Sequence, residues 1–389
     1  MDAKLIEFAT VRQLEYLEAV EKYGSQRAAA KALGVGKTSL QESLALLNKK
    51  AAAKAYSPKH NLVNPVPDPF YAKGYSQYYD KDGKPGGQWI KAAVDVDRQK
   101  EIMESALKAM CEEIPKAAPI VEPITPSNSL CNLVVFTDYH LGMLAWHKEG
   151  GADWDLKIAE ALLLKSFIYL IDNAQQASML VLCLQGDFLH TDGLLPLTPA
   201  HKHVLDADGR FPKIVDVAIR VIRKMLAHAL ATHKRVHLIV CEGNHDEIGS
   251  MWMRKMFSVL YENEPRLTVN ESELPFYVFQ WGKTMLAFHH GHKVNNGDLP
   301  ILFASKFSVI WGVTTKRYGH CGHRHHSEEK EHSGIIIQQH QTLAANDAHG
   351  ARHGYISERY ANLTTYHKDF GRTGTVSVCP EMFVDNENK

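Results

Sequence analysis

The sequence predicts a layered α/β fold with a small all-α domain in front of it. Short runs of mostly branched or aromatic residues, bounded by polar residues or glycine, recur through the second half of the chain, as buried strands do. The first part of the chain instead places apolar side chains at helical spacing. We therefore expect a helical domain over residues 1–56, a connector over 57–130 and an α/β domain over 131–389.

The N-terminal domain is predicted to be a helix-turn-helix. A first helix over Thr10 to Tyr23 carries one apolar stripe, Gly24 ends it, and Ser25 caps a second helix. Gly34 then makes the turn into a third helix that begins at Lys37. The stripe consists of Leu14, Leu17, Val20 and Tyr23, and the residues expected to hold the third helix on the core are Leu40, Leu44 and Leu47.

The exposed face of the third helix is expected to bind DNA, because its side chains can bond base edges or phosphates from a major groove. These side chains belong to Lys37, Thr38, Ser39, Gln41 and Ser43. Residues 1–59 hold ten Lys or Arg against six Asp or Glu, whereas the whole chain has a formal net charge of zero, and this asymmetry fits a phosphate-binding head. A helical bundle used for dimerisation or for contact with another protein is the alternative, so a homodimer stays open.

The connector is predicted to contain a β-hairpin. Four prolines between residues 58 and 69 discourage helix, and strand residues flank a turn at 80–87 within the range Tyr75 to Ile90. The aromatic residues of the hairpin could stack on bases, although cross-strand pairs that hold a hairpin are their commoner use. They are Tyr75, Tyr78, Tyr79 and Trp89. A charged helix over 95–114 and a proline-rich linker over 115–126 follow.

Five polar clusters in the α/β domain indicate metal chemistry. Each is expected to follow an apolar run, so that several strand ends deliver Asp, Asn and His to one edge of a sheet, where such proteins bind ligands. Carboxylate, imidazole and amide oxygen without thiolate suit Mn²⁺, Fe²⁺ or Zn²⁺ better than Ca²⁺. The set exceeds the needs of one ion but suits two, bridged by a carboxylate at roughly 3.5–4 Å. The clusters are Asp138-Tyr139-His140, Gly186-Asp187-Phe188-Leu189-His190, Gly243-Asn244-His245-Asp246, His289-His290-Gly291-His292 and Gly322-His323-Arg324-His325.

The order of these clusters, D-x-H, G-D, G-N-H-D, H-G and G-H-x-H, resembles the calcineurin-like metallophosphoesterase superfamily over about Leu133 to His325. The resemblance implies a four-layer αββα sandwich, and it implies hydrolysis of a phosphoric ester by a hydroxide that bridges two metal ions. Asp187 is the implied bridge between the metals. Taken singly, D-x-H or H-G is weak evidence, because structural histidines without a ligand role give the same pattern, whereas G-N-H-D after a strand is more specific. The resemblance assigns one metal to Asp138, His140, Asp187 and His325, and the other to Asp187, Asn244, His290 and His323.

Three further residues receive catalytic roles. The resemblance implies that His245 steadies the transition state and protonates the leaving oxygen, and we expect Asp246 to orient it. His190 resembles a histidine of the DNA-repair exonuclease branch that helps to place the DNA backbone, with a partly exposed loop histidine as the alternative. Within the pair His289-His290, the ligand is expected to be His290, because it directly precedes glycine.

Composition limits the class of protein. The chain of 389 residues is long enough for one catalytic domain and a small head. Its six cysteines show no C-x-x-C spacing, so we expect reduced thiols in a cytoplasmic protein. We expect no signal peptide and no membrane association, because no apolar stretch reaches the roughly 18 residues that a span needs. A small head fused to a nucleic-acid enzyme also resembles phage or prophage replication and repair proteins, in which case the cytoplasm is that of a bacterial host.

These observations favour a two-metal phosphoesterase that acts on nucleic acid. We expect a nuclease that hydrolyses phosphodiester bonds in single- or double-stranded DNA, with Mn²⁺ as its metal and Fe²⁺ or Zn²⁺ as alternatives. A phosphomonoesterase or cyclic-nucleotide phosphodiesterase with a regulatory or protein-binding head is the first alternative, because selectivity is set by loops that the resemblance does not cover. A DNA-binding regulator with an inactive metal domain is the second, and the complete ligand set with His245 argues against it.

Overall fold

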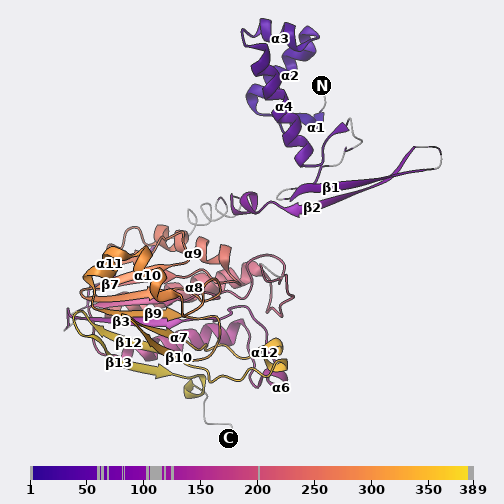
Figure 1. The fold of residues 1–389 in the computed structure, drawn as a ribbon. Helices are drawn as coiled ribbons and strands as arrows, with labels where there is room; N and C mark the ends of the chain where they lie inside the picture. The colour runs from indigo at the N-terminus through magenta and orange to yellow at the C-terminus, as the bar shows by residue number, and fades with distance from the viewer. Residues whose placement is uncertain are drawn as a thin grey trace. The chain divides into compact units, whose positions relative to one another are not determined.

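The computed structural model divides into two compact units, Met1–Ala106 and Leu107–Lys389 (Figure 1). It describes residues 3–58, 62, 65–67, 70–80, 82, 84–101, 105, 116–117, 120–123, 127–199 and 202–383. The expected boundaries at residues 56 and 130 stay a prediction. The expected helix over 95–114 is helical over 96–101, and most of its remainder lies outside the described residues, as does part of the linker over 115–126.

The first predicted helix begins and ends at the residues that the sequence indicated, and the two that follow begin at the expected residues. Thr10 accepts the N–H of Gln13, whose side chain binds back to Thr10 N–H, so the two residues form a capping box. Gly24 ends the helix in the left-handed conformation, with φ at 72°. Ser25 then caps the next helix by accepting the N–H of Ala28 at 3.2 Å. The helices are α1 (Ala3–Ile6), α2 (Val11–Tyr23), α3 (Gln26–Ala32) and α4 (Lys37–Ala53).

The core of this unit differs in part from the predicted stripe. Tyr16 and Ala19 of α2 are buried, whereas Tyr23 is 45% exposed, so the stripe that faces the core ends one turn earlier than expected. The small side chains of α3 allow close approach of the helices, since Ala29 and Ala30 are buried against this core. The predicted contacts of α4 are confirmed by the burial of Leu40, Leu44 and Leu47.

The predicted hairpin is confirmed, and it is longer than expected. Strands β1 (Phe70–Tyr79) and β2 (Pro85–Val94) pair antiparallel as a separate two-stranded sheet. Its turn is closed by Asp80, which accepts the N–H of Lys84 at 2.8 Å.

The second unit contains a six-stranded and a five-stranded sheet. In the six-stranded sheet four neighbouring strands are parallel, and helices connect the successive pairs, as in βαβ units. Its strands, in spatial order, are β13 (Gly371–Val378), β12 (Ala361–His367), β3 (Leu130–Phe136), β4 (Met179–Leu184), β5 (Arg235–Val240) and β6 (Leu267–Val269). The connecting helices are α7 (Leu156–Asp172), α8 (Phe211–Thr232) and α9 (Glu247–Leu260).

The five-stranded sheet also ends at the predicted clusters. Strands β8 and β9 are parallel and carry the last two clusters at their carboxyl ends. The expectation of an apolar run before the fifth cluster is wrong, because β9 contains Lys316, Arg317 and His320. The strands, in spatial order, are β10 (Glu328–His332), β11 (Ile335–Gln339), β9 (Lys316–Cys321), β8 (Thr284–Phe288) and β7 (Tyr277–Trp281).

Side chains from both sheets form one core between them, and helices cover the outer faces. Leu133 and Val181 of one sheet share a cluster with Leu286 of the other. On the outer face of the six-stranded sheet, Phe136 lies 6.5 Å from Phe167 of α7 between ring centroids. Helices α10 (Leu299–Lys306) and α11 (Ser308–Val313) pack on the outer face of the five-stranded sheet. The predicted αββα sandwich is confirmed (Figure 1).

Several short elements lie outside the sheets and the long helices of the described chain. They include α6 (His147–Gly150), α12 (Ala348–Arg352), a 3₁₀ turn (Pro380–Phe383) and isolated bridges such as the one between Leu197 and Val204. Five cysteines are described and all are free, in agreement with the expected reduced state. Across the described part of the chain, no helix combines the length and the apolar character needed to cross a bilayer.

Leu40→Ala should lower the free energy of unfolding of the first unit by about 2–5 kcal/mol, because it leaves a cavity at a side chain that is 0% exposed. Leu46, in the same helix, is 63% exposed, so Leu46→Ala is the matched control and should change stability by less than about 0.5 kcal/mol. Hydrogen exchange of the α4 amides during a urea titration of the full chain measures both. Equal effects would contradict the observed core.

Candidate metal centre

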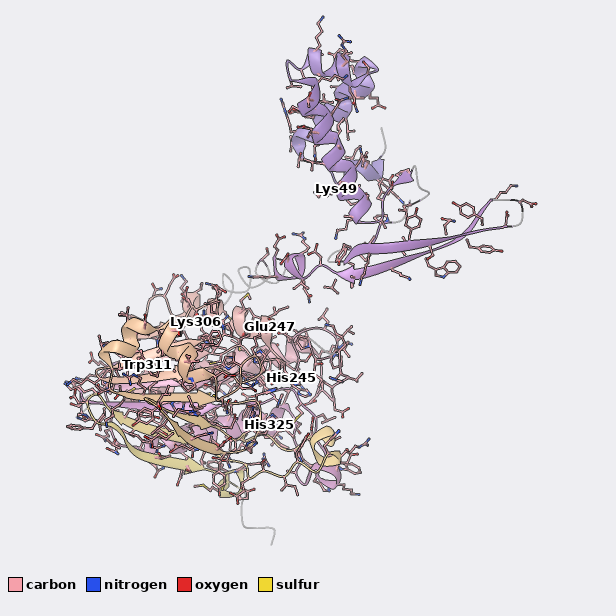
Figure 2. The ribbon with its side chains drawn as sticks, in the orientation of Figure 1. Lys49, His245, Glu247, Lys306, Trp311 and His325 are labelled. Atoms are coloured by element: carbon pink, nitrogen blue, oxygen red, sulfur yellow. The ribbon has the colours of Figure 1, made fainter. Side chains whose placement is uncertain are left out.

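The predicted ligands meet where strands of the two sheets end. Because β3, β4 and β5 are parallel, their carboxyl ends share one edge, and the loops after β8 and β9 reach the same place. His245 and His325, which Figure 2 labels, lie 4.7 and 5.5 Å from His140 between ring centroids. The loops at this edge carry Asp138, His140, Asp187, Asn244, His290, His323 and His325.

Two groups of side chains bring their potential ligand atoms within 4.8 Å of one another. The nitrogen Nε2 of His290 lies between the groups, 3.2 Å from Asp187 Oδ2 and 3.8 Å from Asp138 Oδ1. The two groups therefore form one centre. The first contains Asp138, His140 and His325, and the second contains Asp187, His290 and His323.

Buried atoms without hydrogen bonds indicate that a cation fits this centre. Asp138 Oδ1, Asn244 Oδ1 and His290 Nε2 have no hydrogen-bond partner within the described protein. An unpaired buried polar atom costs free energy, so native proteins rarely retain one without a further ligand. Carboxylate and amide oxygens bind divalent transition metals, and so does the imidazole nitrogen of His290 once it has released its proton. The groupings of His and Asp thus suit divalent ions.

The carboxylate of Asp138 is held so that one oxygen stays available. Its Oδ2 accepts a hydrogen bond from Thr137 Oγ1 and a second, at 2.8 Å, from His323 N–H. Its Oδ1 lies 3.1 Å from His325 Nε2. The loop itself is fixed by Thr342, whose hydroxyl donates to the carbonyl oxygen of Asp138 at 2.7 Å. Hydrogen bonds of this kind orient ligands before a metal binds.

Asp187 and His290 are oriented in the same manner. The backbone N–H of His245 donates to Asp187 Oδ1 at 2.7 Å, which leaves Oδ2 toward His290. His290 Nδ1 lies 2.8 Å from the carbonyl oxygen of Gln185, which can only accept, so Nδ1 carries the proton. Nε2 of His290 is then the nitrogen that faces the two carboxylates.

The backbone at the ligands adopts a conformation that side chains usually avoid. Seven non-glycine residues in the described chain have positive φ, and five of them are predicted ligands. Each such residue costs of order 1–3 kcal/mol and persists only where its surroundings require it. Their φ angles fall between 48° and 75°. The five are Asp138, His140, Asp187, His323 and His325.

The glycines of the clusters are required by close packing. A Cβ at Gly186 would lie 2.6 Å from His290 Cγ, and one at Gly243 would overlap Asp187 Oδ1. A Cβ at Gly322 would overlap the hydroxyl oxygen of Thr137. The glycine in G-D, G-N-H-D and G-H-x-H therefore lets one ligand loop approach another.

Burial and charge set the protonation of the centre. Burial raises the pKa of Asp138, but the imidazoles of His325 and His290 outweigh it and hold that pKa below its usual range. Burial lowers the pKa of His140, which is therefore neutral and able to donate a lone pair. Burial also lowers the pKa of His290, but the carboxylates of Asp187 and Asp138 raise it to about 10.

A third group joins His140 with the two predicted catalytic histidines. His140, His190 and His245 also place ring nitrogens within 4.8 Å of one another. The nitrogen Nδ1 of His245 lies 2.9 Å from the carbonyl oxygen of His190 and must donate to it. The alternative of an exposed loop histidine at His190 is wrong, because the residue is 2% exposed and its Nδ1 lies 3.3 Å from that of His140.

The structure corrects the expectation that Asp246 orients His245. The carboxylate of Asp246 accepts four backbone N–H groups, and the backbone carbonyl of His190 holds His245 instead. The donors are Asp187, Phe188, Leu189 and Gly243. Asp246 thus fixes the loop that carries Asp187. Asp246 is the N-cap residue of α9, but its side chain makes no cap hydrogen bond to that helix.

Within the pair His289-His290, the second histidine lies beside Asp187 and His323. His289 is buried and stacks on Phe276 at 5.0 Å between ring centroids. Sequence patterns did not identify Thr137, Gln185 or Thr342, which orient ligands. They come directly before a cluster or from a distant loop, and only their hydrogen bonds reveal them.

The residues predicted to bind DNA lie in the first unit. Lys37, Thr38, Ser39 and Gln41 are exposed at the start of α4. Ser43 was placed wrongly on the exposed face. It is half-buried, and its carbonyl oxygen accepts Gln13 Nε2 at 2.9 Å, because it adjoins the buried stripe of the helix.

Comparisons with known proteins found no matching family model and no matching curated protein. Among solved structures, the chain aligns with one described as a novel archaeal phosphodiesterase, at 11% identity and a TM-score of 0.34, over 64% of this chain and 99% of the other. It aligns with Vacuolar Protein Sorting 29 from Cryptosporidium parvum at 11% and 0.31, over 64% and 97%. It aligns with Vps29 complexed with zinc from Entamoeba histolytica at 13% and 0.28, over 64% and 98%. Likenesses at this level carry no inference about this chain, so the centre is interpreted from its own residues.

Gly243→Ala should weaken Mn²⁺ binding by at least about tenfold, because the new Cβ displaces the Asp187 carboxylate. Gly193 provides the matched control, since a Cβ there meets nothing within 4 Å. Gly193→Ala should bind as the wild type does. Calorimetric titration of both metal-free variants measures the affinities, and unchanged binding by Gly243→Ala would contradict the assigned role of Asp187.

Metal binding should release protons and strengthen as the pH rises from 6 to 8. The pKa of His290 is raised to about 10, so its imidazole is protonated at every pH below that value, and a cation must displace the proton. Calorimetric titration with Mn²⁺ in buffers of different ionisation enthalpy counts the released protons. An enthalpy that is independent of the buffer would contradict the assignment of His290 as a ligand.

Proposed function

We propose that this protein is a two-metal phosphoric ester hydrolase and that its substrate is nucleic acid, which it cuts at phosphodiester bonds. The proposal rests on one observation. Two groups of Asp and His share the centre at the strand ends, and the imidazole of His245 lies beside them. Mn²⁺ is the proposed metal, with Fe²⁺ and Zn²⁺ as alternatives, because the donors are oxygen and imidazole nitrogen without thiolate.

Two divalent ions, when bound, would lower the pKa of water and neutralise charge on the phosphoryl oxygens. Asp138, His140 and His325 would hold one ion, and His290 and His323 the other, with Asp187 between them and Asn244 Oδ1 as a further donor. The chain's own residues fix this arrangement through the hydrogen bonds to both carboxylates.

His245 is placed to give a proton to the leaving oxygen. Its Nδ1 donates to the carbonyl oxygen of His190, so the ring cannot rotate without losing that bond. Its Nε2 remains to hold or release a proton. The backbone carbonyl of His190 therefore orients His245, and the ring of His190 contacts the ring of His140.

Nucleic acid as the substrate is supported by the first unit. Four polar side chains at the start of α4 are exposed on a helix that the buried leucines hold firmly. Residues 1–59 are basic, with ten Lys or Arg against six Asp or Glu. Such a helix can place side chains in a major groove and approach phosphates. Glu42 is exposed on the same helix and would repel phosphate, so the contact is expected at the first turn.

Purified protein with Mn²⁺ should shorten end-labelled DNA and hydrolyse a chromogenic phosphodiester. His245→Ala should lower kcat by about 10²–10⁴-fold through loss of the proton donor. It should retain its metals, because the N–H that binds Asp187 belongs to the backbone. His147, which is exposed and paired with Asp153, gives the matched control, and His147→Ala should cut DNA as the wild type does.

Single- and double-stranded DNA are tested side by side with a chromogenic phosphomonoester. Intact DNA together with rapid monoester hydrolysis would contradict the nuclease and favour a phosphomonoesterase. If the metal-loaded protein hydrolyses neither DNA nor either chromogenic ester, the proposal that it is a phosphoric ester hydrolase is contradicted.

A further inference from the structure

The hairpin of the first unit exposes aromatic rings, and among the described residues no third strand pairs with it. Strands β1 and β2 form a sheet of two strands only, drawn as a long ribbon in Figure 1. A two-stranded hairpin is marginally stable in water unless something packs on it. Trp89 is 64% exposed and Tyr75 is 48% exposed. These aromatic side chains therefore need an explanation other than a core.

Cross-strand pairing does not account for the exposed rings. Trp89 lies opposite Ser76, and Tyr75 lies opposite Ile90, so neither ring has an aromatic residue directly across the ladder. Aromatic cross-strand pairing therefore does not explain the rings of Trp89 and Tyr75.

One face of the hairpin carries the exposed indole of Trp89, and we name it the Trp89 face. Alternation along the strand places Trp89, Lys91 and Gly87 on the same side, and their partners across the ladder at the first two positions are Ser76 and Gly74. A Cβ at Gly87 would touch the Trp89 ring at 3.4 Å, so the indole lies along a position that has no side chain. Small neighbours leave room for a second flat ring on the indole.

The charge of the ribbon favours a phosphate backbone. Strands β1 and β2 contain two Lys and no Asp or Glu. Asp80 lies at the turn, where its carboxylate accepts the N–H groups of Asp82 and Lys84. A second copy of the hairpin would offer Lys73 and Lys91 no acidic partner, whereas a nucleic acid offers one phosphate for each nucleotide.

We propose that the Trp89 face binds single-stranded nucleic acid by stacking an unpaired base on Trp89 and by pairing Lys91 with a phosphate. Ring stacking requires bases that are not already stacked in a duplex. The small residues around the ring, Gly74, Ser76 and Gly87, cannot reach base edges in a groove, so duplex readout is not supported. The inference rests on the proposed function in one respect, which is that the bound strand is the substrate.

Binding is tested on the full chain in EDTA, with a labelled thymidine oligonucleotide of about 20 nucleotides and a duplex of equal length, by fluorescence anisotropy. Trp89→Ala should weaken single-strand binding by about 5- to 100-fold, and Trp89→Phe should restore most of it, since a phenyl ring still stacks. Tyr75, an exposed ring on the opposite face, is the matched control. Tyr75→Ala should bind within about twofold of the wild type, because one base stacks on one ring.

Three results would overturn the inference. They are unchanged binding by Trp89→Ala, an equal loss in Tyr75→Ala, and a dimer of the wild type that Trp89→Ala converts to a monomer. Photo-crosslinking of an iododeoxyuridine oligonucleotide to the wild type needs no variant. Crosslinks within Pro85–Val94 support the inference, and crosslinks confined to other segments overturn it.

The same variants separate the inference from the proposed function. Mn²⁺-dependent hydrolysis of a chromogenic phosphodiester should be equal in Trp89→Ala and the wild type, because the hairpin holds no ligand of the centre. A wild type that binds the strand through Trp89 but never cuts it would leave the inference intact and remove the proposed function. If the wild type cuts DNA but Trp89→Ala binds the strand normally, the proposed function stands and the inference about Trp89 is overturned.

Discussion

The buried carboxylates of Asp138 and Asp187 end two neighbouring parallel strands, and they lie close to the same imidazole of His290. Like charges in a low-dielectric interior repel each other, so this edge of the fold needs positive charge. In the protein alone that charge is the proton of His290, whose pKa is raised to about 10. Divalent cations would supply it more completely, and Asn244 Oδ1, which has no hydrogen-bond partner within the described protein, would then gain one. The chemistry proposed here follows from this requirement.

The rest of the α/β unit keeps these carboxylates in place. Five predicted ligands have left-handed backbone, a conformation that persists in such residues only where their surroundings require it. Gly186 and Gly243 allow those loops to touch, and Asp246 binds four amides beneath the loop of Asp187. Close packing and hydrogen bonds thus hold these loops in one conformation, whereas exposed loops usually move. A substrate would meet a centre that is already arranged, which lowers the cost of reaching the transition state.

Sequence patterns predicted the strands and helices that local composition determines. They predicted less well the features that depend on tertiary contacts. Strand β4 is wholly apolar, as expected of a run before a cluster, whereas β9 carries Lys316 and Arg317 and departs from that expectation. In α2 the pattern misplaced the end of the buried stripe, since Tyr23 is exposed. The contact of Asp246 was also misjudged, because a carboxylate beside a histidine in sequence binds whichever donors the fold presents. The order of the clusters was enough to predict the seven residues proposed to bind metal. Other residues that hydrogen-bond to them, directly before a cluster or in a distant loop, could be identified only from the structure.

The most direct measurement is a crystal structure of the Mn²⁺-loaded protein with anomalous data at the manganese edge. We expect two peaks, separated by roughly 3.5–4 Å and flanking the carboxylate of Asp187. The first should contact Asp138, His140 and His325, and the second His290 and His323. A single peak, or two peaks of which only one contacts Asp187, would contradict the dinuclear centre and with it the proposed hydrolysis of phosphoric esters.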